Sequence, residues 1–141
     1  EYAKNKQYRE TYDLCVSRAV SNLATLSEYC LPYVKTGGYF ISYKSGTVQE
    51  EVEQAQKAVK ILGGKIQDVV YFQLPDSEIQ RSLVVIEKIK ATPGRSAQSR
   101  DSAERTPVII YRNLSQLFSQ NHHTFILFLS QLSHRIFQEQ T

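Results

Sequence analysis

The sequence lacks Met and Trp altogether, and it contains only two cysteines in 141 residues. A chain translated from its own start codon begins with Met, so the absence of Met predicts an internal or processed piece. The two cysteines, Cys15 and Cys30, are too few for a disulfide framework. We interpret them as small buried hydrophobic residues of a protein in the reducing cytosol, and we therefore predict a cytoplasmic location.

Long hydrophobic segments are also missing. The longest apolar run, residues 125–129, is far shorter than the ~20 residues of a membrane-spanning helix. The first residues, EYAK, lack the apolar core of a signal peptide. Hydrophobic residues make up 41% of the chain and charged residues 22%, which is typical of one globular domain. The net charge of +3 permits an anionic partner without requiring one, and we expect no membrane partner.

Motifs for cofactor binding and acid–base catalysis are absent as well. No Gly-rich loop follows a strand and opens a helix, so no phosphate or dinucleotide cradle is predicted. The Ser and Asp residues lack a His near the expected sheet, which argues against a catalytic triad. His122, His123 and His134 have no Cys or acidic cluster beside them, so we predict no metal site. We therefore predict no catalytic acid, base or nucleophile.

The residue patterns that are present predict an α/β sheet in the order β-α-β-α-β-β. The strands are expected at residues 13–18, 38–44, 65–74 and 82–87. The first helix follows Ser21 or Asn22 as its N-cap, and the second begins near Glu50. Gly37-Gly38 and Gly63-Gly64 are both predicted to terminate helices. Strand-helix-strand units favour parallel pairing, and the last hairpin adds an antiparallel strand.

Three cations lie where these strands meet loops. Arg18 ends the first strand, Lys44 ends the second, and Arg81 opens the last. Because an antiparallel strand begins where parallel strands end, all three are predicted at one rim of the sheet. Ligands of open α/β sheets bind outside the carboxyl ends of the strands, so this rim is a candidate site. The alternative for each residue is a surface cation without a partner.

The composition changes after Arg95. Every Lys and every Gly lies before Ser96, and the remaining residues are rich in Ser and Gln. Within them, Phe125, Phe128, Leu129, Leu132 and Ile136 fit one face of a helix. We therefore predict a first region at residues 1–95 and a separate tail at residues 96–141, helical or disordered.

Several ordered pieces of residues 1–95 resemble the bacterial 16S ribosomal RNA guanine-N7 methyltransferase family, also called glucose-inhibited division protein B. The pieces are Tyr12-Asp13, Ser17-Arg18-Ala19-Val20, residues 30–38, Lys44-Ser45-Gly46, Leu62-Gly63-Gly64, Leu74-Pro75, residues 81–86 and Thr92-Pro93. Each piece is short, but the set occurs in the same order and at the same spacing as in the family. The resemblance covers about two thirds of the chain.

The resemblance implies the back half of a class I S-adenosylmethionine-dependent, Rossmann-like methyltransferase sheet. It implies an enzyme with S-adenosyl-L-methionine as cofactor and 16S ribosomal RNA, or the small ribosomal subunit, as partner. Guanine N7 already presents a lone pair, so methyl transfer needs alignment of donor and acceptor rather than a general base. The lack of a catalytic base therefore agrees with the resemblance. The Gly-rich cofactor loop of the family is absent, so we expect this chain alone to be inactive and to expose a sheet edge.

The resemblance also implies roles for the three cations. Arg18 matches the family's arginine at the cofactor pocket, where a guanidinium can bind a carboxylate. Lys44 and Arg81 match basic positions of the same rim, which suit contacts with RNA or substrate. At position 82 this chain has Ser where many relatives have His.

The tail departs from the family, whose members continue with a basic, proline-rich end. Residues 96–108 can be encoded by codons that, read one base later, specify PRRAGIPPKEPL, which is such an end. We therefore hypothesise a frame change at residues 95–96. The alternatives are a genuine accessory helix and, for the whole chain, a protein-interaction module or half-domain that needs a partner chain to complete its fold.

Overall fold

The computed structural model describes residues 6–18, 21–73, 76, 78–94 and 108–111. The elements, in chain order, are β1 (Tyr12–Ser17), α1 (Leu23–Cys30), the 3-10 turn η2 (Leu31–Tyr33), β2 (Val34–Ser45), α2 (Gln49–Ile61), β3 (Gly64–Gln73), β4 (Gln80–Lys88) and β5 (Val108–Tyr111). Up to β4 this is the predicted order β-α-β-α-β-β, which is therefore confirmed.

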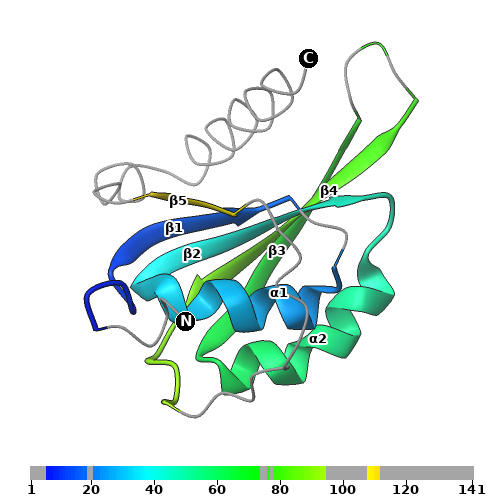
Figure 1. Cartoon of the computed structure of the whole chain (residues 1–141). Helices are drawn as coiled ribbons and strands as arrows, with labels where there is room; N and C mark the ends of the chain where they lie inside the picture. The colour runs from blue at the N-terminus through cyan, green and yellow to red at the C-terminus, as the bar shows by residue number, and fades with distance from the viewer. Residues whose placement is uncertain (1–5, 19–20, 74–75, 77, 95–107, 112–141) are drawn as a thin grey trace.

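The strands form one mixed five-stranded sheet in the order β3-β4-β2-β1-β5 (Figure 1). β1 and β2 are parallel, whereas β4 runs antiparallel to both β2 and β3. The predicted parallel pair and antiparallel hairpin are thus both present. Since β1 and β2 end where β4 begins, the sheet has a rim at this end and a base at the other.

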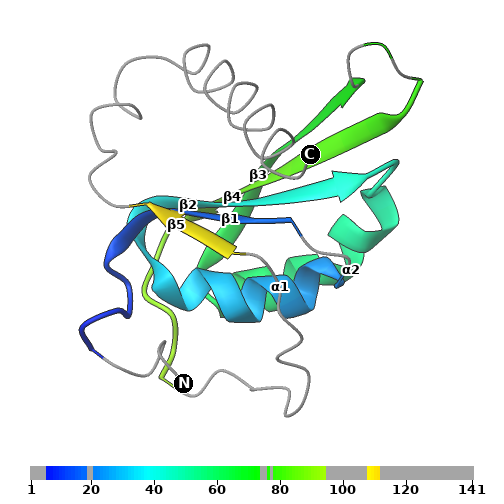
Figure 2. The same ribbon diagram turned by 45° about the horizontal axis from the view of Figure 1, so that its top comes forward.

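Both helices cover the same face of the sheet (Figures 1 and 2). Between helices and sheet lies a core cluster that includes Cys15, Phe40, Val84 and Ile86 from the strands. Cys30 belongs to the same cluster, and both cysteines are buried and unpaired, as predicted. The opposite face carries a second cluster of buried apolar side chains: Leu14, Val16, Ile41, Tyr43, Leu83 and Val85. None of the described helices is long and apolar enough to cross a membrane.

The end of α1 differs from the prediction. α1 begins at the predicted cap, where the Asn22 side chain accepts a hydrogen bond of 2.9 Å from the Thr25 amide. It ends at Cys30, and Pro32 then lies in the 3-10 turn. Gly37-Gly38 is therefore no helix terminator, because β2 already begins at Val34.

Gly37 and Gly38 instead allow an irregularity between β1 and β2. The pairing runs from Tyr12 with Val34 to Leu14 with Tyr39, so β2 contains extra residues here. Gly37 has a φ of +87°, and a Cβ on Gly38 would lie 2.6 Å from the Asp13 carbonyl oxygen. Only glycine fits both requirements, which explains the pair without a helix end.

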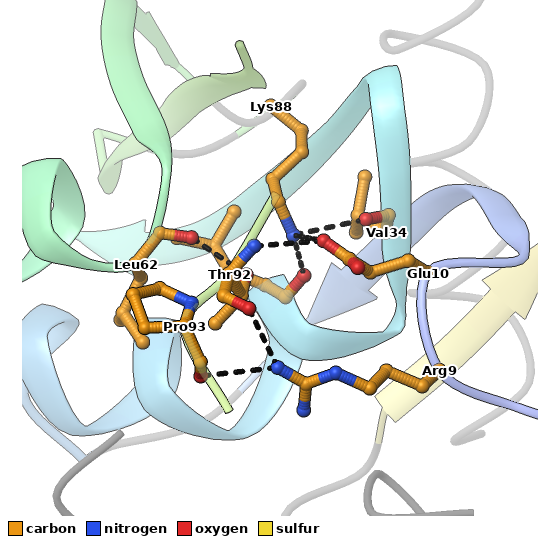
Figure 3. A network of polar contacts seen from close by, with 8 residues as sticks. Arg9, Glu10, Val34, Leu62, Lys88, Thr92 and Pro93 are labelled. Carbon is orange, nitrogen blue, oxygen red and sulfur yellow. Dashed lines mark hydrogen bonds and ion pairs between the residues drawn. The ribbon is translucent and has the colours of Figure 1, made fainter. Parts of the chain in front are cut away.

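A buried polar network closes the base of the sheet, and we call it the basal clasp (Figure 3). At its centre is Lys88, whose side chain is 0% exposed. The Lys88 ammonium donates hydrogen bonds to the carbonyl oxygens of Leu31 at 2.6 Å and Val34 at 3.0 Å. Its third partner is the Glu10 carboxylate, 3.2 Å away. Burial lowers the pKa of Lys88, and the hydrogen bond with Glu10 opposes this shift.

Further hydrogen bonds of the clasp join the segment before β1 to the segment after β4. Glu10 also accepts from the Thr92 amide at 2.8 Å, and Arg9 donates to the carbonyl oxygens of Thr92 at 2.8 Å and Pro93 at 3.1 Å. The Thr92 hydroxyl donates to the Leu62 carbonyl oxygen at 2.6 Å. The clasp therefore connects the segments that enter or leave β1, β2, β3 and β4 at the base (Figure 3).

Part of the tail forms a strand, which the prediction of a helical or disordered tail did not include. β5 pairs antiparallel with β1, from Leu14 with Tyr111 to Ser17 with Val108 (Figure 2). The residues Val-Ile-Ile-Tyr favour a strand, and the edge of β1 offers unpaired backbone groups. The edge that we expected to be exposed is thus paired over these residues. The predicted helical pattern at residues 125–137 and the three histidines lie outside the described residues.

Candidate functional site

The three predicted cations do lie at one rim of the sheet. β1 pairs with β2 up to Ser17 and Ser42, so Arg18 directly follows the end of β1, and Lys44 lies near the end of β2. β2 then pairs with β4 at Lys44 with Ser82 and at Ser45 with Arg81. The cations therefore lie at the same end of three neighbouring strands, as predicted.

The pleat of the sheet separates two of these cations. Successive side chains of a strand point to opposite faces. Lys44 is in phase with Phe40, which packs under the helices, whereas Arg81 is in phase with Leu83 and Val85 on the other face. The side chains of Lys44 and Arg81 therefore lie on opposite faces of the sheet, and these two cations do not form one compact cluster.

Lys44 is buried and has partners inside the molecule. Its side chain is only 7% exposed. The ammonium lies 2.7 Å from Oε1 of Glu51 and donates a hydrogen bond to the Ser21 carbonyl oxygen. Glu51 belongs to the first turn of α2, and its Oε1 also accepts from the Leu23 amide at 2.6 Å. In this conformation the charge of Lys44 is thus neutralised within the chain.

Beside Lys44, a row of small hydroxyl side chains crosses the sheet under the helices. Ser17 pairs with Ser42, Ser82 pairs with Lys44, and Ser42 and Lys44 share one face of β2. All three serine side chains are 0% exposed, and their hydroxyls have no hydrogen-bond partner in the described part of the chain. The rim therefore contains buried hydrogen-bonding groups next to the Lys44–Glu51 pair. Most buried polar groups in proteins do have a partner.

Arg81 and Arg18 differ from Lys44. Arg81 is partly buried, and its Nε is a buried donor for which the described ranges provide no acceptor. Arg18 is also partly buried and lies outside regular secondary structure. Neither arginine belongs to the Lys44–Glu51 pair.

Comparison with known proteins identifies the chain. A family model described as "GidB: rRNA small subunit methyltransferase G" matches residues 1–84, which include all three rim cations. The chain belongs to the rRNA small subunit methyltransferase G family. The resemblance predicted from the ordered sequence pieces is thus confirmed.

Individual relatives agree with this assignment. The chain is 50% identical over 109 residues to ribosomal RNA small subunit methyltransferase G of Clostridium novyi (strain NT). It is 48% identical over 109 residues to the protein of that name from Lachnoclostridium phytofermentans and 42% identical over 108 residues to the one from Clostridium tetani. These matches cover 77% of this chain but only 45% of each relative. The chain therefore spans less than half the length of these family members.

Among solved structures, the chain is similar to an arsenic(III) S-adenosylmethionine methyltransferase from Chlamydomonas reinhardtii. The TM-score is 0.32 at 13% sequence identity, over 64% of this chain and 42% of that chain. This similarity is too low to bear on function.

Sequence reasoning missed the partners of Lys44. It assigned Glu51 to the start of a helix because an acidic residue suits the positive end of the helix dipole. The structure shows that the same carboxylate also contacts Lys44 and Leu23. A buried lysine requires an acidic partner, and that rule could have directed the search to the neighbouring helix start. Over the residues that the structure describes, no group of His, Cys, Asp and Glu side chains could hold a metal ion.

Proposed function

We propose that this chain is the carboxyl-terminal part of an S-adenosyl-L-methionine-dependent enzyme that methylates N7 of a guanine in 16S ribosomal RNA. The observation that carries the proposal is the family match over residues 1–84 together with the position of the three matched cations at one rim. This rim lies at the carboxyl ends of the parallel strands, where open α/β sheets bind their ligands.

The chemistry of the reaction suits a rim without a general base. The N7 atom of guanine would form the new N–C bond with its own lone pair while the S–C bond of the methyl donor breaks, so the donor would leave as a neutral thioether and the positive charge would move to the guanine. No proton would have to be removed first. The protein must instead hold the two reactants in line and exclude water, and alignment alone contributes up to about 7–11 kcal/mol to catalysis. Cations at the rim supply binding and orientation, which is the contribution that this reaction needs.

Each cation has a different part in the proposal. The guanidinium of Arg18 binds the carboxylate of the methyl donor through paired hydrogen bonds. Arg81, on the other face of the sheet and with a buried Nε that lacks an acceptor in the described residues, binds the RNA backbone or base. Lys44 would contact RNA only after its ammonium leaves Glu51 and the Ser21 carbonyl oxygen.

The activity is proposed for the complete family fold rather than for these 141 residues alone. The chain spans 45% of the length of its relatives, and its sequence contains no Gly-rich loop between a strand and a helix. We expect negligible binding of S-adenosyl-L-methionine by the chain alone. A partner chain that supplies the remainder of the fold should restore binding of S-adenosyl-L-methionine. We propose that the complete protein acts in the bacterial cytoplasm, where 16S ribosomal RNA is found.

The test combines this chain with the part of the C. novyi relative that the alignment does not cover. Transfer of a labelled methyl group from S-adenosyl-L-methionine to 16S ribosomal RNA is measured, and the product is mapped by mass spectrometry. We expect no transfer by either piece alone and transfer to guanine N7 by the mixture. Tight cofactor binding by this chain alone would contradict the claim that it lacks the cofactor loop.

The roles of the cations are tested in the same mixture. Arg18→Ala should raise the KM for S-adenosyl-L-methionine by about 10–100-fold, because it removes a hydrogen bond between charged groups. Lys57→Ala, on the exposed side of α2, is the matched control and should change the KM little. If the mixture folds but transfers no methyl group, the proposed enzymatic role fails, and the alternative of a half-domain with a binding role takes its place.

A further inference from the structure

The contacts of Glu51 join three parts of the chain that are distant in sequence. Its Oε1 accepts a hydrogen bond from the Leu23 amide and forms an ion pair with the Lys44 ammonium, at 2.6 and 2.7 Å. The ammonium in turn donates to the Ser21 carbonyl oxygen. The first turn of α2, the end of β2 and the start of α1 are thereby connected, and we call this set of contacts the rim tether.

The rim tether supplies hydrogen bonds that the start of α1 cannot make by itself. The first amides of a helix have no acceptor within the helix. The Asn22 side chain caps one of them, the Thr25 amide, at 2.9 Å. The amide of Leu23, the first residue of α1, is instead bound by a carboxylate 28 residues further along the chain. Glu51 therefore supplies an acceptor for an amide at the start of α1 that has none within its own helix.

The same contacts involve residues on both sides of Arg18 in the sequence. Immediately before Arg18, Ser17 is paired with Ser42 of β2. After it, the Ser21 carbonyl oxygen is bound by Lys44, which also belongs to β2. β2 thus binds both Ser17, the residue before Arg18, and Ser21, three residues after it. Loss of the Lys44 contact would remove one of the two attachments to β2 that flank Arg18 in the sequence.

A solvent-exposed ion pair would not have this effect, because such pairs contribute little to stability. The rim tether differs because Lys44 is 7% exposed and the side chain of Glu51 29% exposed. One carboxylate oxygen also serves two donors from different segments. Removing it leaves a buried ammonium without its counter-charge and a helix amide without its acceptor.

We infer that Glu51 is a positioning residue of the rim, which acts through Lys44 and the start of α1 to hold Arg18 in place. Lys44 then acts mainly inside the protein rather than at its surface. The inference rests on the proposed function only in so far as Arg18 is the residue that contacts the methyl donor. The tether itself can be tested without any enzymatic activity.

The experiment uses the full chain and measures amide hydrogen exchange by NMR. In Glu51→Ala, exchange at the Leu23 amide should be at least about tenfold faster than in the unmodified chain. Exchange at Val84, which lies in the centre of the sheet, should stay the same. The amide and guanidinium signals of Arg18 should shift. Glu51→Gln keeps an acceptor oxygen without the charge and should give a smaller change in the same direction, which protects the test if Glu51→Ala fails to fold.

Glu53→Ala is the matched control, since Glu53 lies on the exposed side of α2, where its carboxylate accepts a hydrogen bond from Gln49 at 3.5 Å. It should leave Leu23 and Arg18 unchanged. Equal acceleration at Leu23 and Val84 would overturn the inference, because it would show general destabilisation. Faster exchange at Leu23 with unchanged Arg18 signals would also overturn it, since the tether would not reach Arg18.

The outcomes also separate this inference from the proposed function. If the Leu23 and Arg18 signals respond but the reconstituted mixture transfers no methyl group, the tether stands and the proposed function fails. If the mixture is active and Glu51→Ala leaves both the NMR signals and the KM for S-adenosyl-L-methionine unchanged, the positioning role fails and the function stands.

Discussion

The two ends of the sheet each contain a buried lysine, but the ammonium groups of these lysines have different partners. At the base, the Lys88 ammonium binds the carbonyl oxygens of Leu31 and Val34 as well as Glu10. At the rim, the Lys44 ammonium binds Glu51 and one carbonyl oxygen. Both charges are compensated, so the difference between the two ends lies in the groups around them.

In the basal clasp, the polar groups near Lys88 form hydrogen bonds with one another. The Thr92 hydroxyl and amide both have acceptors, and Arg9 binds two carbonyl oxygens. At the rim, three buried serine hydroxyls and the Nε of Arg81 have no partner among the residues described. Satisfied buried polar groups stabilise a fold, whereas unsatisfied ones reduce its stability. The comparison therefore assigns more of the stability to the base than to the rim.

The largest effect should come from Lys88→Met at the base. The substitution leaves two carbonyl oxygens and the Glu10 carboxylate without their common donor, because the side chain of Lys88 is fully buried. We expect the free energy of unfolding to fall by about 3–5 kcal/mol. Urea unfolding measures it, with the exposed Lys90→Met as the control that should change little. A loss below about 1 kcal/mol would show that the clasp is not the main support of the base.

Two glycines with positive φ offer a matched comparison of base and rim. Gly63, with φ of +88°, faces Lys90, whose carbonyl oxygen would lie 2.1 Å from a new Cβ. Gly46, at the end of β2 with φ of +68°, has nothing within 4 Å. We expect Gly46→Ala to cost about 1–2 kcal/mol through backbone strain and Gly63→Ala about 3 kcal/mol or more, since a backbone clash is added. Equal losses in thermal or urea unfolding would mean that the segment of Lys90 moves aside easily.

The pH dependence of stability should also distinguish the base. Burial lowers the pKa of Lys88 below the ordinary lysine value of 10.5. As the pH approaches 10.5, the unfolded chain therefore holds a proton that the folded chain has released, and the free energy of unfolding rises with pH. Just below pH 10.5, the free energy of unfolding of the unmodified chain should rise with pH more steeply than that of Lys88→Met. The difference between the two slopes should be up to about 1.4 kcal/mol per pH unit.

Urea unfolding of both chains between about pH 8 and pH 10 tests this sign. If the difference between the two chains instead falls as the pH rises, the attraction of Glu10 outweighs the burial of Lys88. The ion pair between Lys88 and Glu10 would then stabilise the base more strongly than its geometry indicates.

The smallest effect is expected at the rim. Ser82→Ala removes a buried hydroxyl that has no partner in the described part of the chain, so stability should be unchanged or should rise by up to about 1 kcal/mol. Thr92→Val at the base should cost about 1–2 kcal/mol, because the Leu62 carbonyl oxygen loses its donor. If Ser82→Ala costs as much as Thr92→Val, a water molecule or ligand binds the Ser82 hydroxyl, and the rim is better satisfied than the contacts suggest.

The sequence predicted much of the fold because the local signals were strong. Hydrophobic strands, the Asn22 cap and the termination of α2 near Gly63 all depend on residues close in the chain. The common rim of Arg18, Lys44 and Arg81 also followed from strand direction alone. The Gly37-Gly38 pair was misread because a helix end and an irregular strand both need glycine, and only the pairing of β2 with β1 decides between them.

The basal clasp, the rim tether and β5 were not predictable in this way. Lys88 binds Leu31, which is 57 residues away in the sequence, and Leu23 binds Glu51, which is 28 residues away. β5 forms by pairing with the edge of β1. The sequence by itself determined the order of the elements from β1 to β4, the family and the end of the sheet at which the cations lie. Only the tertiary structure decided that Lys44 points inward to Glu51 while Arg81 lies on the other face. Strand register and burial, which arise from contacts between distant segments, set the direction and the partners of each side chain.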